Sequence, residues 1–311
     1  MAQSEALAGA HSYILWGVES VYNTAVTPDT HFSKNTTGFK PVINNNTTSN
    51  YGFGGTSEAE GRKVHDYVHG VLDVKSPLNF KVTTWEWLEC ALGAFSTDTY
   101  TIAAIPKSMT VASNIDNPGL TSTDQNVTYS GGVVDDWTLR TSVGEPVSVD
   151  LNVLFALAAL DTSLDTRVAL PTDQTYTFSG ASIALPSGTT IPNIIDSLTL
   201  SGKNNFKMLQ GLSSRLTRNA LPKAAGINID ISLKYLSNDL ITAALGAATP
   251  TATGGPTEYA SMVLVFSNGT NTMTMTLTGV PLTEFVQIHE NTDPLGEDLK
   301  FTAKDITAVL S

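Results

Sequence analysis

The sequence predicts a mainly β protein built from two tandem units, and three observations support this prediction. Short segments with an apolar residue at every second position alternate with clusters of Thr, Asn, Ser, Gly and Pro, as in strands joined by turns. One helical heptapeptide recurs half a chain later. The chain also has 311 residues, of which 41% are hydrophobic. This length suits two domains of about 100–200 residues, each with its own core.

The predicted strands are bounded by turn-forming residues. Two of them form a hairpin that turns at residues 142–145. The segment 161–174 is polar, contains a proline and lies near the midpoint, which favours a boundary between two domains. The clearest alternating segments are 133–141, 147–153, 227–235, 262–266 and 272–277.

A short helix interrupts this β pattern in the first half of the chain. Thr83 is followed three residues later by Glu86, the arrangement of a capping box. The helical segment 85–92 then ends at Gly93, a residue that commonly terminates helices. We therefore expect one helix with its N-cap at Thr83.

A second helix with the same ending is expected at 240–245, capped by Ser237 or Asn238. Its sequence repeats that of the first: residues 88–94 (LECALGA) match 241–247 (ITAALGA), 153 positions apart. We interpret this match as a tandem duplication, with a first β domain at 1–165 and a second at 166–311.

The charge balance excludes some classes of function. The chain has 17 basic and 29 acidic residues, a formal charge of −12, and only 15% charged residues. Proteins that hold nucleic acid use Lys and Arg to displace counterions from phosphates, so an acidic chain argues against this class. A negative surface that only maintains solubility is the simpler alternative.

Cysteine content and hydropathy limit the cellular setting. Cys90 is the single cysteine, so neither internal disulfides nor a multi-cysteine metal site is expected. The N-terminal segment shows no basic and apolar signal pattern. The longest apolar run, 153–160, is too short to span a bilayer. We therefore expect a soluble protein without a membrane partner.

The chain contains no complete signature for metal or phosphate binding. His65 and His69 have the spacing of two metal ligands on a helix, but their surroundings predict a strand, where they would lie about 13 Å apart. The sequence Gly202-Lys203-Asn204 lacks the earlier glycine and the final hydroxyl of a phosphate-binding loop. No metal and no cofactor are therefore expected.

Catalytic residues are also not apparent. Gly-x-Ser-x-Gly does not occur, and Cys90 lies on an Ala/Leu helix face, where a packed hydrophobe is expected rather than a nucleophile. Asp135 and Asp136 are adjacent in a predicted strand and point to opposite faces, so they cannot share an acid–base site. The sequence does not predict an enzyme.

Three patterns occur together in the chain. They are the N-terminal stretch 16–25 (WGVESVYNTA), the strand–helix unit that ends in Ala-Leu-Gly, and two similar strands, 134–139 (VDDWTL) and 195–200 (IDSLTL). In these patterns the chain resembles the tail tube proteins of long-tailed viruses of bacteria and archaea. The resemblance extends over most of the chain as a pattern and carries no catalytic residue.

This resemblance implies a fold and a mechanical function. Each unit would be a tube-type β-sandwich or barrel with one short helix, and six units would form a ring. A chain with two units would then form a trimeric, pseudo-hexameric ring, and stacked rings would form the channel for genome ejection. Arms that reach a neighbouring ring are expected at 1–12, at the Asn-rich loop 34–62 and at 291–311.

The same resemblance implies partners and a location. The partners would be further copies of the chain and other tail proteins, namely a tape measure, a terminator, a baseplate and, in contractile tails, a sheath. DNA would pass in transit without specific binding, and the protein would lie in the virion tail after assembly in the host cytoplasm. Candidate acids facing the lumen are Glu58, Glu60, Asp135 and Asp136.

Two alternatives remain open at this stage. A baseplate hub or distal tail protein would share the fold but cap the tube. A β-rich surface adhesin or carbohydrate-binding module would account for the abundance of Thr and Asn and for the tryptophans.

Overall fold

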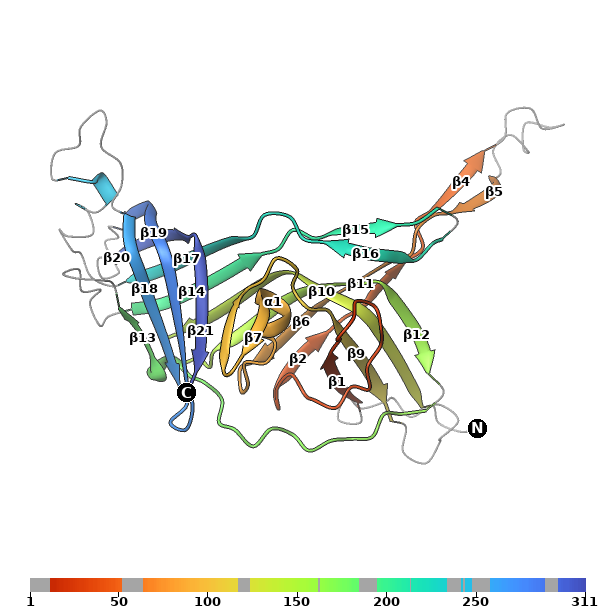
Figure 1. Ribbon diagram of the computed structural model, residues 1–311, viewed down its shortest axis with the longest axis horizontal. Helices are drawn as coiled ribbons and strands as arrows, with labels where there is room; N and C mark the ends of the chain where they lie inside the picture. Colours follow the sequence, from red (N-terminus) through yellow and green to blue (C-terminus); the bar gives the residue numbers. More distant parts are fainter. Residues whose placement is uncertain are drawn as a thin grey trace.

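The computed structural model is mainly β, as predicted, and its strands are antiparallel throughout (Figure 1). The structure describes residues 12–51, 64–116, 124–161, 163–184, 195–212, 214–233, 242, 244–247, 258–288 and 296–311. We call the strands before the irregular segment 163–176 the first half and those after it the second half. In Figure 1 this segment runs along one side of the molecule from β12 to β13.

One sheet, which we call the large sheet, extends through both halves. Its strands follow the order β2 and β3, β6, β11, β10, β14, β17, β20, β19. The two halves meet where β10 pairs with β14, with Leu139 opposite Leu200. The bounds in the first half are β2 Thr36–Phe39, β3 Val42–Asn44, β6 Asp73–Lys81, β10 Gln125–Ser142 and β11 Ser148–Phe155. Those in the second half are β14 Ile195–Lys203, β17 Gly226–Leu233, β19 Thr272–Ile288 and β20 Gly296–Ala303.

Two smaller sheets cover one face of the large sheet. The first outer sheet has the order β1, β9, β10, β12, and the second has the order β13, β18, β19, β21, β8, β7. Figure 1 shows them at opposite ends of the molecule, with α1 between them. The bounds are β1 Ser12–Val18, β7 Gly93–Ser96, β8 Thr99–Ile102, β9 Met109–Ile115, β12 Leu157–Asp161, β13 Ala181–Ala184, β18 Glu258–Ser267 and β21 Asp305–Leu310; a short 3-10 turn spans Phe178–Gly180.

The order of strand pairing is the same in the two halves. The long strand β10 pairs with β9 and β12 in the first outer sheet and with β11 in the large sheet. The long strand β19 pairs in the same way with β18 and β21 and then with β20. In each half the next strand of the large sheet is β6 or β17, and the next helical residues described along the chain are those of α1 or residues 242, 244 and 245.

Irregularities of the ladders also occur at equivalent places. The register of β10 shifts between Val134 and Asp136, and that of β19 shifts between Leu282 and Glu284. A glycine with positive φ precedes each bulge by the same number of residues, Gly131 at 63° and Gly279 at 58°. Because L side chains rarely adopt this conformation, glycine allows both strands to bend from one sheet into another.

The first helix is shorter than the sequence predicts. α1 spans Leu88–Leu92 and ends at Gly93, whose φ of 110° confirms the predicted stop. The predicted N-cap is wrong: Trp87 occupies that position, and the Thr83 hydroxyl has no hydrogen-bond partner. In the second half, Thr242, Ala244 and Leu245 are helical and Gly246 has a φ of 77°, while Ser237 and Asn238 lie outside the described residues.

A continuous core lies between the large sheet and the outer sheets. Tryptophans of the first half join it to the second half: the ring of Trp85 lies 5.1 Å from that of Tyr176 and 5.8 Å from that of Phe266. Trp137 is 1% exposed and lies directly over Gly202 of the neighbouring strand. The halves therefore share packed side chains as well as a sheet.

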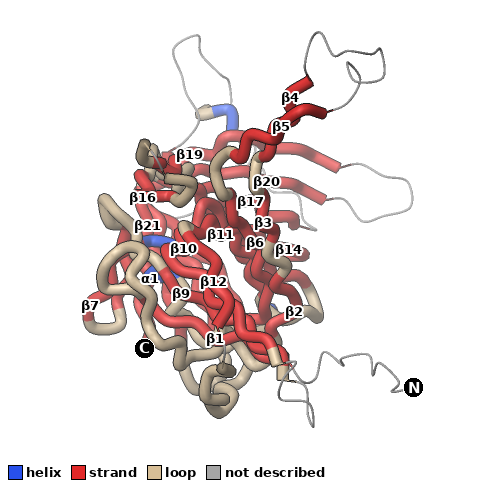
Figure 2. Tube along the Cα trace, turned by 90° about the vertical axis from the view of Figure 1, so that its right-hand side faces the viewer, coloured by secondary structure: helices blue, strands red, loops and turns tan. Residues whose placement is uncertain are grey.

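Two hairpins project from the large sheet at the same place in each half (Figure 1). Figure 2 shows β4 and β5 extending away from the other strands. β4 (Thr47–Tyr51) pairs with β5 (Val64–His69) between β3 and β6. β15 (Lys207–Gln210) pairs with β16 (Thr217–Leu221) between β14 and β17. The second hairpin reaches the base of the first, where Arg215 Nε donates to the carbonyl of Gly70 at 2.9 Å.

Two expectations about arms need correction. The segment 34–62 is not a long loop throughout, since it begins with β2, β3 and β4; residues 52–63 lie outside the described part. Within the expected C-terminal arm 291–311, the described residues from 296 on form β20 and β21, whose apolar side chains, such as Phe301 and Ile306, are almost fully buried. The arm expected at 1–12 lies, apart from Ser12 in β1, outside the described residues.

Candidate assembly surfaces

The predicted N-terminal motif 16–25 folds around a buried carboxylate. Glu19 is 2% exposed, and its two oxygens accept four hydrogen bonds, from Ser108 Oγ and the Asn23 amide at 2.6 and 2.8 Å and from Thr110 Oγ1 and the Gly131 amide at 2.8 Å each. Glu19 therefore fixes the loop after β1 to β9 and to the bend of β10. The role is structural, since all four partners belong to the scaffold.

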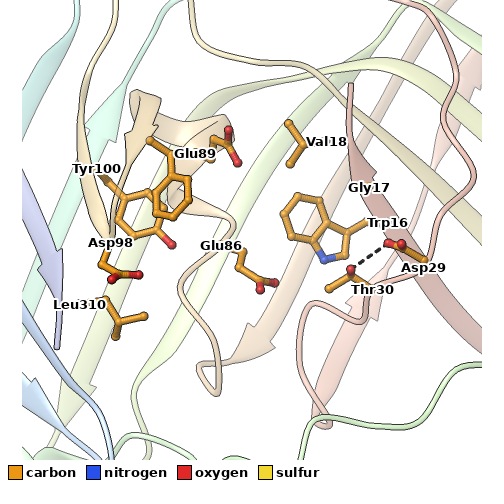
Figure 3. Close-up of a pocket in the computed structure, with 11 residues that line it drawn as sticks. Trp16, Gly17, Val18, Asp29, Thr30, Glu86, Glu89, Asp98, Tyr100 and Leu310 are labelled. Carbon is orange, nitrogen blue, oxygen red and sulfur yellow. Dashed lines mark hydrogen bonds between the residues drawn. The ribbon is translucent and has the colours of Figure 1, made fainter. Parts of the chain in front are cut away.

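A recess of about 350 Å³ beside this motif has an acidic lining (Figure 3). Glu86, Glu89 and Asp98 line it together with the Trp16 and Tyr100 rings. Burial, and then the charges of Asp29, Asp173 and Glu89, raise the pKa of Glu86. In the part of the chain that the structure describes, no group of three His, Cys, Asp or Glu side chains has a geometry suited to a metal ion.

Residues considered for catalysis or metal binding occupy structural positions. Cys90 is fully buried in α1, and burial raises the pKa of its thiol far above the usual range, so the thiolate is disfavoured. His65 and His69 lie in strand β5, as expected. The His69 ring is hydrogen-bonded to the Thr47 hydroxyl at 3.2 Å across the hairpin.

The four acids considered for the lumen separate into three cases. Glu58 and Glu60 lie outside the described residues. Asp136 lies on the side of the large sheet opposite to Trp137, where its carboxylate accepts a hydrogen bond from the Asn152 amide at 3.1 Å. The carboxylate of Asp135, in the bulge, instead accepts a hydrogen bond from the main-chain amide of Phe206 at 2.5 Å.

The face of the large sheet opposite to the core is polar. On it, carboxylates are matched by donors: Arg140 lies 3.1 Å from Asp150, and Lys300 lies 2.9 Å from Glu284. Ser232 donates to Asp298 at 2.7 Å. Further residues of this face are Lys75, Asn79, Lys81, Thr138, Thr199, Ser201, Lys203, Asn228, Asp230 and Thr302. The face therefore carries both charge signs rather than an excess of acids.

The two outermost strands of the large sheet expose apolar side chains. Val42 and Ile43 of β3 are 51% and 49% exposed, and Val286 of β19 is 40% exposed. Among the described residues, β3 pairs only with β6, and residues 284–288 of β19 pair only with β20. Unpaired strand edges of this kind favour pairing with another chain. The sequence analysis did not identify these residues, because the alternating pattern does not show which strand lies at an edge.

The described part of the chain thus has two unpaired sheet edges and a polar sheet face. The chain matches the family model described as phage tail tube protein over residues 9–303, and it therefore belongs to this family. The resemblance noted in the sequence is thus confirmed, and the family implies a non-enzymatic component of the virion tail that assembles with itself and with other tail components. A search of curated proteins found no match. No helix among the described residues has the length and apolar character needed to cross a membrane.

Proposed function

We propose that three copies of this chain form a closed, pseudo-hexameric ring, and that stacked rings form the channel through which the viral genome is ejected. One observation carries the proposal. Inside the chain, β10 of the first half pairs with β14 of the second half, and strands equivalent to these two form the outer edges of the large sheet. β19 is the counterpart of β10, and β2 with β3 is the counterpart of β14. A head-to-tail contact between such edges closes into a ring when the rotation allows it.

The equivalence of β14 with β2 and β3 follows from their pairing registers. Phe39 lies opposite Leu78 of β6, and Leu198 lies opposite Ile231 of β17. The register shifts between Thr36 and Gly38 in one ladder and between Ile195 and Ser197 in the other, at the same distance from these pairs. Counting along the strands from these positions places Val42 at the position of Ser201.

The equivalence of β19 with β10 follows from their bulges. Val286 is two residues beyond the shifted residue Glu284, as Thr138 is two residues beyond Asp136. Thr138 lies opposite Ser201 at the junction inside the chain. The proposed contact between chains therefore places Val286 opposite Val42 of the next subunit and covers the exposed apolar side chains of both edges.

The thickness of the molecule favours one side of the large sheet as the channel wall. The outer sheets and α1 all cover the same face of the large sheet. Because these elements take up more space, this face belongs on the outside of the ring, where the circumference is larger. The polar face then lines the channel. Asp136, on this face, is a lumen-facing residue in this arrangement, whereas Asp135 lies at the junction with the second hairpin.

The charge pattern of this wall suits the passage of DNA. A surface retains DNA when its Lys and Arg side chains displace counterions from the phosphates. Here Arg140 and Lys300 are paired with Asp150 and Glu284, which reduces their availability for phosphates. A neutralised polar wall, rather than a strongly negative one, would allow DNA to slide without binding.

The ring can be tested by a disulfide between the two proposed edges. Val42→Cys and Val286→Cys are introduced in one chain, whose natural cysteine, Cys90, is buried. Oxidation of the assembled protein is expected to give covalent species of up to three chains and none larger on non-reducing electrophoresis. Negative-stain electron microscopy of the same sample should show rings or stacked tubes.

The matched control moves one cysteine out of register. Gly38→Cys with Val286→Cys places the partners about 13 Å apart along the strand, at roughly 3.3 Å per residue, which is too far for a disulfide. Equal cross-linking of both variants would contradict the register, and a covalent ladder beyond three chains would contradict the closed trimer. Isolated rings that never stack would favour a hub that caps the tube.

A further inference from the structure

Asn204 anchors the junction between the two halves of the chain. Its side chain is 8% exposed, and its Nδ2 donates to the carbonyls of Ala91 and Val134, each at 2.9 Å. Its main-chain amide donates to the carbonyl of Asp135 in the β10 bulge at 2.7 Å. Asn205, with a φ of 49°, then turns the chain into the projecting hairpin. One amide side chain thus bridges the helix and the long strand of the other half.

The same pair of asparagines occurs at the start of the first hairpin. Counting along the equivalent strands from Phe39 and Leu198 places Asn45 at the position of Asn204 and Asn46 at the position of Asn205. Asn46 shares the unusual backbone conformation, with a φ of 44°. Asn45, in contrast to Asn204, is exposed.

An acceptor site for Asn45 exists in the second half of the chain. Ala244 is the counterpart of Ala91 in the repeated helix, and Leu282 and Thr283 are the counterparts of Val134 and Asp135 in the bulge. Together these residues line a pocket of about 270 Å³; the other lining residues are Leu245, Glu284 and Phe285. The pocket lies beside the edge of β19 that the proposed ring assigns to the next subunit.

We infer that Asn45 of one chain inserts into this pocket of its neighbour, with its amide donating to the carbonyls of Ala244 and Leu282. This inference rests on the proposed ring. The side chain is oriented for such a contact in the single chain, since Arg215 Nη2 donates to Asn45 Oδ1 at 2.9 Å and leaves Nδ2 for the neighbour. The Thr283 carbonyl accepts the Asn45 main-chain amide, as the Asp135 carbonyl accepts that of Asn204.

The two junctions differ in their apolar contacts. Inside the chain, Phe206 packs against Val133 and Ala220 beside Asn204. Between chains, Thr47 stands at the position of Phe206, and Pro281 stands at that of Val133. Beside the asparagine, the junction between chains therefore has fewer apolar contacts, and the hydrogen bonds of Asn45 contribute a larger share of the local stability.

The test compares the same substitution at equivalent positions. Asn45→Ala is expected to leave the thermal unfolding of the isolated chain unchanged and to weaken ring assembly about 10- to 100-fold, as expected for the loss of two hydrogen bonds to buried carbonyls. Asn204→Ala is expected to lower the Tm of the isolated chain. Asn219→Ala, at an exposed asparagine of β16, is the matched control. Assembly is measured as the ring fraction against concentration by analytical ultracentrifugation.

Each outcome has a definite consequence. Weaker assembly of Asn45→Ala with normal assembly of Asn219→Ala supports the inference. Equal assembly of these two variants overturns it, while the ring itself stands. Absence of rings from the wild-type chain overturns both the ring and the inference. A loss of Tm in Asn45→Ala as large as that in Asn204→Ala would also overturn it, because Asn45 would then act mainly within its own chain.

Discussion

Glu19 joins three segments in the first half of the chain. Its carboxylate accepts four hydrogen bonds, from the loop after β1, from the start of β9 and from the bend of β10. A buried group of this kind stabilises the fold only when all its partners are present, since each unsatisfied donor has a desolvation cost.

Glu19→Gln should therefore lower the free energy of unfolding by about 2–3 kcal/mol. The new amide group would direct hydrogen atoms toward two of the present donors. Urea denaturation followed by tryptophan fluorescence measures this change. Glu258→Gln is the control, because the ion pair of Glu258 with Lys304 is exposed, with side-chain exposures of 50% and 69%. Its loss should change the stability by less than about 1 kcal/mol. Equal effects of the two variants would contradict the role of Glu19.

Tyr22 gives the fold a dependence on alkaline pH. Burial, and then the charge of Glu19, raise the pKa of Tyr22 from 10.0 to about 12. Between pH 10 and pH 12 the unfolded chain ionises at this residue while the folded chain stays neutral, so stability should fall as the pH rises through this window. Tyr22→Phe should make this fall shallower, as measured by urea denaturation at several pH values. An unchanged slope would show that Tyr22 does not contribute.

The sequence predicted where the first helix ends better than where it begins. Gly93 ends α1 as expected, because its positive φ is a local requirement. The cap at Thr83 failed because Trp85 and Trp87 bury their rings in the core, and this packing outweighs the local hydrogen bond of a capping box. Asn204 was considered only as part of an incomplete phosphate loop. The pair Asn45-Asn46 repeats the pair Asn204-Asn205 and could have indicated a shared role. The sequence alone does not align the two pairs, however, because the alignment depends on the pairing registers of the strands.

β10 and β19 are the elements that organise the fold, because each takes part in two sheets. Their length could not be predicted, since Gly131 and Gly132 inside β10 resemble a turn between two strands. The C-terminal strands were missed for another reason. Residues 296–310 alternate as other strands do, but their position at the end of the chain was interpreted as an arm.

The pairing of β10 with β14 depends on a glycine. A Cβ at Gly202 would lie 2.3 Å from the Trp137 ring, which is almost fully buried. Gly202→Ala should therefore displace Trp137 and destabilise the protein by about 1–3 kcal/mol, the usual cost of overpacking. A Cβ at Gly226, in the adjacent strand, meets no atom within 4 Å. Gly226→Ala should thus be nearly neutral in thermal unfolding, and equal losses in both variants would contradict this account.

For the whole molecule, the acidic excess does not gather on the sheet face that we assign to the channel. The formal charge of −12 does not by itself decide how this face would interact with DNA, because the distribution of charge matters more than its sum. Pairs such as Arg140 with Asp150 were not visible in the sequence, since they join residues of adjacent strands.

Adding unpaired positive charge to this face should make the assembled protein retain DNA. Thr138→Lys with Asn228→Lys is expected to give rings that bind duplex DNA, with an affinity that falls steeply between 50 and 200 mM salt. Fluorescence anisotropy of a labelled duplex measures this binding. Thr270→Lys, in the exposed turn of the second outer sheet, should bind much less. Similar binding by both variants would place the channel on another face.

The covalent connection between the two halves also has a kinetic consequence. Of the six junctions in the proposed trimeric ring, the three between β10 and β14 form within a chain, where the effective concentration of the two edges is far higher than that of free subunits. Only two encounters between molecules and one closing contact are then needed, and arcs with an odd number of units do not occur. A duplicated subunit therefore has fewer incomplete intermediates in which assembly can stall, so closed rings should form efficiently at lower protein concentration than from single units.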